Sequence, residues 1–374
     1  MSNLAPDADL DIGQLLQFAL EKEASDLIVT AGSPPAFRIN GELRFLSGAR
    51  LSPEASRRLV YAALTDEQIA KFESRHELDF SLTIEQSVRF RGNVFMQRGA
   101  VGAAFRLIPS KIPTLQDLNL PPIFEEFALQ HQGLIVITGP TGHGKSTTQA
   151  AMIDLINTKR RCHIVTIEDP IEFVHTNRGC VIEQREVGMD TEGFGVALRH
   201  VLRQDPDVIL IGEMRDVETM AAALTAAETG HLVLSTLHTN DTVQAIDRIL
   251  DSFPAHQQNQ VRMQLAFCLL AGIAQRLLPR ADGKGRVAAI EVMRNNHAVS
   301  NLIREEKTQS IYTVLETHAK EGMMTMDSSI KELYLRGVIT REVARRRMRD
   351  PSTLDRGGAR GATGPGAAPQ PPVQ

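Results

Sequence analysis

A glycine-rich loop directly after a short apolar run constrains the fold more than any other feature of this sequence. The loop reads GPTGHGKSTT over residues 139–148, and the run before it reads GLIVIT. Its spacing of glycines, lysine and serine matches the loops that hold phosphate groups with backbone N–H groups. Such a loop connects a buried strand to a helix, and the pattern predicts both, with the helix running from about Lys145 to Asn157.

The residues of this loop are suited to bind ATP together with Mg²⁺. The glycines let the backbone curl so that its N–H groups face inward, and the helix that follows adds its positive N-terminal end. Lys145 can reach the β- and γ-phosphates, and the Ser146 hydroxyl can ligate Mg²⁺. We therefore expect the nucleotide to be bound by Gly139, Pro140, Thr141, Gly142, His143, Gly144, Lys145, Ser146 and Thr147.

His143 lies at a variable position of this loop, where the backbone does the binding. Its side chain either points away from phosphate or makes a contact that is sensitive to protons or metal ions. We favour the first interpretation because Lys145 and Ser146 already supply the specific side-chain contacts.

Acidic residues follow two further apolar strands. In DVILIGEMRD the apolar residues end at Ile211, and Glu213 comes two positions later, where a carboxylate could hold the metal shell or orient the attacking water. In IVTIEDPIE the strand ends in Glu168, Asp169 and Glu172. Three acids so close together would repel one another unless a cation or ordered water lies between them.

Two histidines and a group of arginines are further candidates. His231 and His238 bracket the strand-like run LVLSTL, but zinc is discounted because no cysteine or third histidine has ligand spacing. A γ-phosphate or interface contact and an ordinary buried histidine both remain open for them. Arg91 and Arg106 belong to neighbouring strand-like runs, where they are either solvated or offered to the nucleotide of a neighbouring subunit.

Composition is that of an ordinary globular chain of two to three domains. It has 374 residues, 42% hydrophobic and 23% charged, with a net charge of −4. Three scattered cysteines favour a reducing cytosol, and we expect neither a signal peptide nor a membrane-spanning run. The slightly negative net charge argues against nucleic acid as a partner, as do the absence of tryptophan and the count of three tyrosines.

The patterns divide the chain into six stretches. The fold class is α/β, because strand-helix alternation after residue 123 predicts a parallel sheet covered by helices. A small α+β domain precedes it, with helices starting near Ser52-Pro53 and Thr65. The expected stretches are 1–10, a loose leader; 11–108, the α+β domain; 109–122, a linker; 123–294, the nucleotide-binding core; 295–350, a helical segment; and 351–374, a disordered tail.

The motifs resemble those of the secretion-ATPase superfamily, which powers type II secretion and type IV pili. The resemblance rests on GPTGHGKSTT, TIEDPIEFVH, LRQDPDVILIGEMRD and TAAETGHLVLSTLHTN, and it extends from about residue 25 to about residue 350. It is closest to the PilT-type retraction ATPases, with the PilU type next. It implies a PAS-like N-terminal domain, a RecA-like P-loop ATPase domain and a ring of six subunits.

The resemblance also implies roles for individual residues. Lys145 and Ser146 correspond to the Walker A residues, Glu213 to an atypical Walker B glutamate, and Arg91 and Arg106 to arginines that reach the neighbour's site. The Asp box of the family corresponds to Glu168, Asp169 and Glu172, and the His box corresponds to His231 and His238. Ile28 stands where many relatives have histidine, and His143 where serine is usual.

Two features favour retraction over assembly. No C-x-x-C pair is present, although assembly members usually carry a four-cysteine zinc module and an extra N-terminal domain. AVSNLIREEK, beginning at Ala298, resembles the retraction signature, with departures at Val299, Ser300 and Glu306. We therefore expect a cytoplasmic ATPase at the inner membrane that works on a membrane platform protein of the pilus base, alone or with a PilT/PilU paralogue. An accessory PilU-like role, a secretion or assembly ATPase, a nucleic-acid translocase and a regulatory nucleotide-binding protein without turnover remain alternatives.

Overall fold

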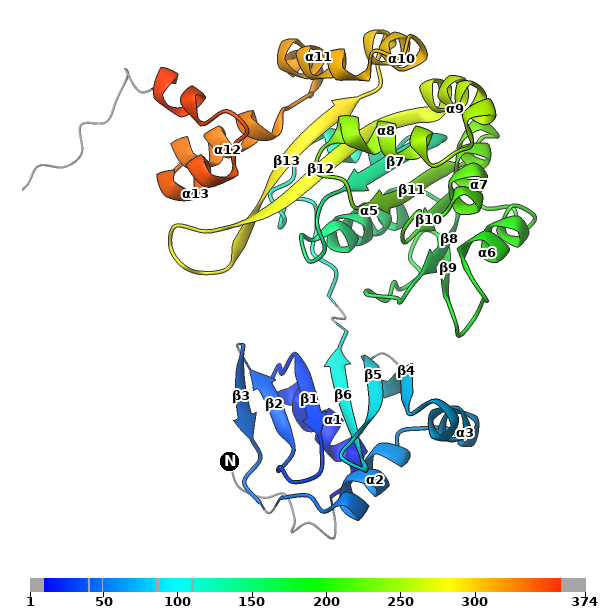
Figure 1. Ribbon diagram of the computed structural model, residues 1–374, viewed down its shortest axis with the longest axis vertical. Helices are drawn as coiled ribbons and strands as arrows, with labels where there is room; N and C mark the ends of the chain where they lie inside the picture. The colour runs from blue at the N-terminus through cyan, green and yellow to red at the C-terminus, as the bar shows by residue number, and fades with distance from the viewer. Residues whose placement is uncertain (1–9, 40, 49, 85–87, 109–110, 358–374) are drawn as a thin grey trace, which may run out of the picture. The chain divides into compact units, whose positions relative to one another are not determined.

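The computed structural model describes residues 10–39, 41–48, 50–84, 88–108 and 111–357. The chain forms two compact units, residues 1–112 with 172–174, and residues 113–171 with 175–374 (Figure 1). Each unit has its own sheet and its own hydrophobic core.

The first unit is an antiparallel sheet covered by helices on one face. Its strands have the order β3-β2-β1-β6-β5-β4. The core lies between that face and three helices, and Gly92 leaves the space into which the Phe80 ring packs, since a Cβ there would lie 2.1 Å from a ring carbon. The elements are α1 (Ile12–Glu21), β1 (Asp26–Val29), β2 (Ala36–Ile39), β3 (Glu42–Phe45), α2 (Pro53–Tyr61), α3 (Asp66–Arg75), β4 (Glu77–Ile84), β5 (Val88–Gln97) and β6 (Ala100–Leu107).

Capping residues set the helix starts of this unit where the sequence predicted them. The Ser52 hydroxyl accepts a hydrogen bond from the Ala55 N–H and so caps α2. Thr65 and Gln68 form a reciprocal capping box at the start of α3. Leu10, the last residue of the predicted leader, is buried in the core of this unit, and residues 1–9 lie outside the described residues.

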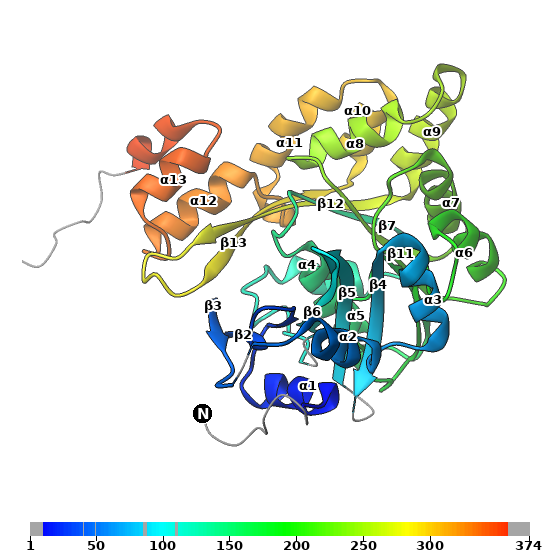
Figure 2. The ribbon, with the colours of Figure 1, turned by 60° about the horizontal axis from the view of Figure 1, so that its bottom comes forward.

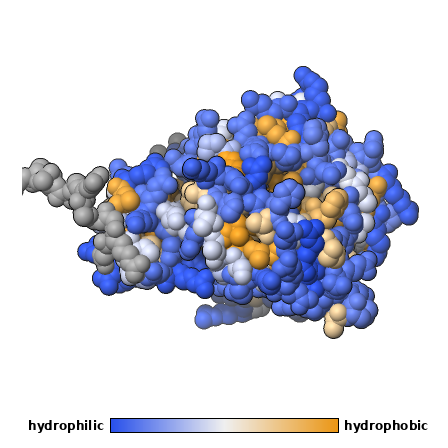
Figure 3. All heavy atoms as spheres, turned by 90° about the horizontal axis from the view of Figure 1, so that it is seen from above, coloured by the Kyte–Doolittle hydropathy of each residue, from blue (hydrophilic) through white to orange (hydrophobic). Residues whose placement is uncertain are grey.

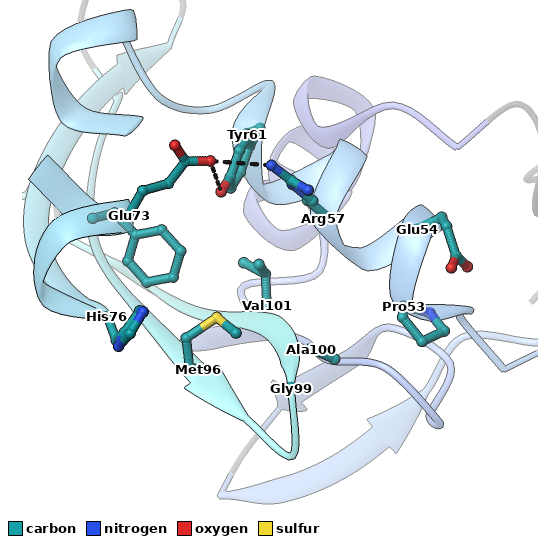
Figure 4. Close-up of a pocket in the computed structure, with 11 residues that line it drawn as sticks. Pro53, Glu54, Arg57, Tyr61, Glu73, His76, Met96, Gly99, Ala100 and Val101 are labelled. Atoms are coloured by element: carbon teal, nitrogen blue, oxygen red, sulfur yellow. Dashed lines mark hydrogen bonds and ion pairs between the residues drawn. The ribbon is translucent and has the colours of Figure 1, made fainter. Parts of the chain in front are cut away.

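A pocket of about 360 Å³ lies in the first unit between α2, α3 and the β5–β6 turn (Figure 4). On one side Arg57 and Tyr61 both bond to the carboxylate of Glu73, at 3.0 Å each, and opposite them lie Met96 and Val101.

The second unit is an α/β domain with a seven-stranded sheet of order β13-β12-β7-β11-β10-β8-β9. All neighbouring strands are parallel except β12 and β13, which form an antiparallel ribbon. The strands are β7 (Gly133–Thr138), β8 (His163–Glu168), β9 (Val181–Glu186), β10 (Val208–Ile211), β11 (Leu232–Leu237), β12 (Leu269–Pro279) and β13 (Arg286–Arg294). The predicted strands β7, β8, β10 and β11 are present, and β7 and β11 are buried along their whole length.

Three strands of this sheet did not stand out in the sequence. The run that forms β12 is apolar and directly follows a helix, so its periodicity does not separate strand from helix. The edge strand β9 is polar at most positions. The antiparallel β13 also departs from the all-parallel sheet that strand-helix alternation predicted.

Helices cover both faces of this sheet (Figure 1). Figure 2 shows α8, α9, α10 and α11 gathered on one side of β12. The helices of the unit are α4 (Ile123–Ala128), α5 (Lys145–Lys159), α6 (Phe194–Val201), α7 (Val217–Glu228), α8 (Thr242–Asp251), α9 (Ala255–Cys268), α10 (His297–Arg304), α11 (Ile311–Thr317), α12 (Met326–Leu335) and α13 (Arg341–Arg347).

Described parts of the predicted linker and of the predicted tail pack on the second unit. Leu115, Leu118 and Leu120 pack on the core of the second unit, so the end of the predicted linker is part of that unit. Residues Pro351–Gly357 form a 3₁₀ helix, and the buried Leu354 packs against α12 and α13. The predicted disorder of 351–374 is therefore wrong for 351–357, and the rest of the tail lies outside the described residues.

The face shown in Figure 3 is mainly hydrophilic, with small separate hydrophobic patches. In the part of the chain that the structure describes, no helix combines the length and the apolar character needed to cross a bilayer.

Candidate nucleotide site

The glycine-rich loop connects the carboxyl end of β7 to the N-terminus of α5. Gly139, Gly142 and Gly144 have φ values of 142°, 76° and 81°, a range that side-chain-bearing residues rarely adopt. The backbone therefore curls at three positions that favour glycine. α5 is 15 residues long, so its N-terminal N–H groups and dipole provide an anion site beside the loop.

Lys145 lies folded over this loop. Its side chain is buried, and its Nζ donates to the carbonyl oxygens of Gly139 at 2.7 Å and Pro140 at 3.2 Å. These bonds keep the ammonium at the mouth of the loop, within the region that phosphate oxygens would enter. Ser146 and Thr147 follow in the first turn of α5 and are half-buried.

Glu213 is connected to the loop through His238. Its Oε1 lies 3.1 Å from Nε2 of His238, and Nδ1 of the same ring lies 3.5 Å from the Thr141 hydroxyl. β11 lies between β7 and β10 and is parallel to both, so the carboxyl ends of the three strands bring the three residues to one edge of the sheet. The side chain of Glu213 is only 19% exposed, which restricts the water around its carboxylate.

Arg215 connects Glu213 to one member of the acidic cluster. Its Nε donates to Oε2 of Glu213 at 2.8 Å, and its Nη1 lies 3.7 Å from Asp169. Glu168 accepts hydrogen bonds from Thr166 and Gln184, at 2.7 and 3.1 Å. These partners stabilise neighbouring carboxylates that would otherwise repel one another.

The predicted acids have different surroundings. Glu172 is exposed, in the segment after β8. The region around Glu213 thus contains Asp169, whereas Glu168 is directed to β9 through Gln184.

His231 lies at the opposite end of β11 from the loop. Leu232, which follows it, pairs with Gly133 at the start of β7. The Nδ1 atom of His231 lies 2.9 Å from the Ala226 carbonyl oxygen. His231 and His238 therefore lie at opposite ends of β11, and a γ-phosphate or interface contact of His231 stays a prediction. A strand of this length separates its two ends by roughly 20 Å.

The His143 ring points to β12. Its Nδ1 accepts the N–H of Leu277 at 2.9 Å, so the ring is neutral at this nitrogen. Burial, followed by the charge of Arg286, lowers the pKa of His143 below its usual range. The side chain thus attaches the loop to the sheet, and its direction relative to bound phosphate stays a prediction.

Arg91 and Arg106 form a direct cross-strand pair on the open face of the first unit's sheet. Arg106 Nε donates to Asp26 Oδ1 at 2.9 Å, and Arg38 lies on the other side of the same carboxylate at 3.5 Å. Arg91 is 3.9 Å from Asp79. Both predicted arginines are exposed, and Asp26 lies between Arg38 and Arg106 across the strands.

Sequence reasoning missed three residues that support the site. Arg215 is part of the motif DVILIGEMRD, in which only the acidic Glu213 was interpreted. Thr239 donates its N–H to the hydroxyl of Thr138 at the start of the loop, at 2.9 Å. Gln275 of β12 contacts the loop from a position more than a hundred residues away, for which no local signal exists.

No group of three or more His, Cys, Asp or Glu residues is arranged to hold a metal ion within the described ranges.

Comparison with known proteins identifies the family. Residues 9–284 match the family model described as type II/IV secretion system protein. The type IV pilus retraction ATPase PilT of Pseudomonas aeruginosa is 46% identical over 92% of this chain and 100% of its own length. The chain belongs to the type II/IV secretion ATPase family.

Within this family the chain is a PilT-like ATPase. The crystal structure of the pilus retraction motor PilT with bound ADP covers 93% of it, with 48% identity and a TM-score of 0.87. The type IV pilus ATPase PilU of Pseudomonas aeruginosa is 44% identical over 90% of the chain and 88% of its own length. The expected α/β fold with a small α+β N-terminal domain is thereby confirmed, and the sheet of that domain is antiparallel.

Proposed function

We propose that this PilT-like ATPase is the motor that retracts type IV pili, using ATP hydrolysis to remove pilin subunits at the pilus base. The observation that carries the proposal is the hydrogen-bonded line from Thr141 through His238 to Glu213. It belongs to a chain that resembles a pilus retraction ATPase over 92% of its length. A phosphate loop joined to a shielded carboxylate is an arrangement for hydrolysis rather than for binding alone.

In this proposal the loop N–H groups and Lys145 bind the β- and γ-phosphates of ATP. Mg²⁺ would be held by the Ser146 hydroxyl together with phosphate oxygens, and it would neutralise charge on the transferred group. Glu213 orients the attacking water and takes its proton. Arg215 holds this carboxylate at one oxygen and His238 at the other, so its direction is fixed before ATP arrives.

The Asp box and the arginines take supporting roles. Asp169 restrains Arg215, and Glu168 attaches the end of β8 to the edge strand β9. We assign Arg91 and Arg106 to the nucleotide of a neighbouring subunit, because such arginines commonly complete phosphate sites in trans. A ring with heterologous contacts follows from this assignment, and the resemblance to PilT-type ATPases implies six copies.

The helical segment after residue 294 is assigned to force output. Val299 and Ile303 of α10 are fully buried against the ATPase core, and Leu302 packs beside them. Arg304 and Lys307 are exposed, and Glu306 forms an ion pair with Arg262 of α9 at 3.0 Å. This exposed end is available to a neighbouring subunit or to a platform protein at the cytoplasmic side of the inner membrane.

Deleting the gene in its host and counting surface pili tests the proposal. Cells without a retraction motor should carry excess pili and should not twitch, and a Glu213→Gln copy should fail to restore twitching. Cells without surface pili would instead identify an assembly ATPase.

An accessory role beside a second retraction ATPase is the other candidate, supported by the 44% identity to PilU. Deletion in hosts with and without the paralogue separates the two. Deleting an accessory subunit should leave basal retraction when the paralogue is present, whereas deleting the principal motor should abolish it.

A further inference from the structure

Gln275 occupies a special position at the edge where the phosphate loop leaves the sheet. β12 pairs with β7 as far as Ala274, which lies opposite Thr138, the last residue of β7. Gln275 is therefore the first residue of β12 beyond the end of its neighbour. Its side chain is only 3% exposed, so its polar atoms must find partners inside the protein.

Both ends of the Gln275 amide are used. Nε2 donates to the carbonyl oxygen of His143 at 2.8 Å, and Oε1 accepts from the Thr148 hydroxyl at 2.8 Å. Because a carbonyl oxygen can only accept, the contact with His143 fixes the orientation of the amide. One side chain thus ties the middle of the loop to the first turns of α5.

The loop is shaped around this residue. A Cβ on Gly144 would lie 2.9 Å from Gln275 Nε2, and a Cβ on Gly139 would lie 2.3 Å from its backbone oxygen. The two glycines therefore provide space for Gln275 as well as backbone freedom. A larger side chain at either position would push the loop off β12.

The bond to His143 also sets the direction of an N–H group. The C=O of His143 and the N–H of Gly144 belong to one planar trans peptide, in which the two bonds point in opposite directions. With the carbonyl held toward Gln275, the Gly144 N–H is turned away from β12. In the curled loop this is the side from which phosphate is approached.

Neighbouring contacts act in the same sense. Leu277 N–H donates to the His143 ring at 2.9 Å, and Arg286 of β13 donates to the Gly142 carbonyl at 3.2 Å. Two loop carbonyls and one ring are therefore held by the β12–β13 ribbon.

We propose that Gln275 is a positioning residue for ATP hydrolysis, which keeps the loop N–H groups directed at the phosphates. The proposal rests on the assignment of this loop as the nucleotide site. Gln275 does not touch substrate; it acts through the His143–Gly144 peptide and through Thr148. Its loss weakens nucleotide binding without removing any group that contacts phosphate.

Two substitutions of different character test this role in the full-length protein. Gln275→Met has similar length and no hydrogen bond, and Gln275→Glu keeps an acceptor for Thr148 but places an oxygen against the His143 carbonyl. Met removes both hydrogen bonds of the amide, and each contributes a factor of about three to ten. The ADP dissociation constant should therefore rise at least about threefold for Met and more than about tenfold for Glu. Amide hydrogen exchange should become faster in residues 139–148 and stay unchanged in β10 and β11.

A matched control and a site control separate the possible failures. Gln149 of α5 is also 3% exposed, but its Nε2 makes no hydrogen bond within the described structure, so Gln149→Met should bind ADP within about twofold of wild type. Lys145→Ala tests the loop assignment itself. Normal ADP affinity and unchanged loop exchange in both Gln275 variants, with Lys145→Ala impaired, would overturn the role of Gln275 alone. Normal binding by Lys145→Ala would overturn the nucleotide site.

Discussion

Replacing Glu213 by glutamine removes the proposed base while preserving the size of the side chain. The amide can still accept at one atom, but it cannot take a proton from water. In the structure the carboxylate contacts Arg215 at 2.8 Å and His238 at 3.1 Å. Among the described residues, its contacts do not include a backbone group of the loop. The substitution should therefore separate hydrolysis from both folding and nucleotide binding.

The expected magnitudes differ widely. Loss of a general base costs about 10²- to 10⁴-fold in turnover, or roughly 3–5.5 kcal/mol of barrier. The lost ion pair is worth little for folding because the Arg215 side chain is 60% exposed, and such pairs contribute about 0.2–1 kcal/mol. Glu213→Gln should thus reduce turnover at least about a hundredfold, while its free energy of unfolding stays within about 1 kcal/mol of the wild-type value.

Three measurements on the same preparations check this: phosphate release at saturating ATP, ADP binding by calorimetry, and urea unfolding. Glu126→Gln is the matched control, because Glu126 also pairs with an arginine, Arg294 at 2.5 Å, away from the loop. It should hydrolyse ATP normally. If Glu213→Gln hydrolyses ATP at the wild-type rate, the carboxylate is not the base, and the line from Thr141 to Glu213 has another purpose.

Further predictions concern the ring, the loop histidine and the C-terminal segment. Mixing Lys145→Ala subunits with Arg106→Ala subunits should restore part of the ATPase activity, because some interfaces receive both intact parts; inactivity of every mixture despite ring assembly would count against action in trans. His143→Ser should change turnover by less than about tenfold, or roughly 1.4 kcal/mol of barrier, and a larger loss would show that the ring does more than attach the loop. Burial lowers the pKa of His143 below 6.5, so its stabilising contribution is complete above that pH and is lost as the pH falls through the folded-state pKa. Wild type should therefore lose more unfolding free energy than His143→Ser when urea unfolding is compared at about pH 7 and about pH 5. Arg304→Ala should keep folding and ATPase activity but lose twitching, whereas Ile303→Ala should cost about 2–5 kcal/mol of stability because the side chain is fully buried; normal twitching with Arg304→Ala would remove this residue from force output.

The sequence was informative about the site wherever the chemistry is local. The loop, its glycines and Lys145 are contiguous, so their spacing alone predicted a strand, a phosphate-binding turn and a helix. The starts of α2 and α3 were predicted for the same reason, since a cap involves residues three positions apart. Glu213 followed from an apolar run that ends at the carboxyl edge of the sheet.

Contacts between distant segments were accessible only from the tertiary structure. His231 and His238 look equivalent on either side of LVLSTL, but a strand places its two ends far apart, so only His238 reaches Glu213. The prediction of disorder was wrong for residues 351–357, because composition does not show that Leu354 finds a core to pack against.

The family, the phosphate loop and the strand ends that carry acids could be predicted from the amino-acid sequence, because they depend on neighbours in the chain. Which strands adjoin, and therefore which side chains meet, became known from the folded structure. β12 lies beside β7 although more than a hundred residues separate them, and that pairing brings Gln275 and Leu277 to His143. A hydrogen bond depends on distance and direction in space, and sequence separation carries no information about either until the sheet order is known.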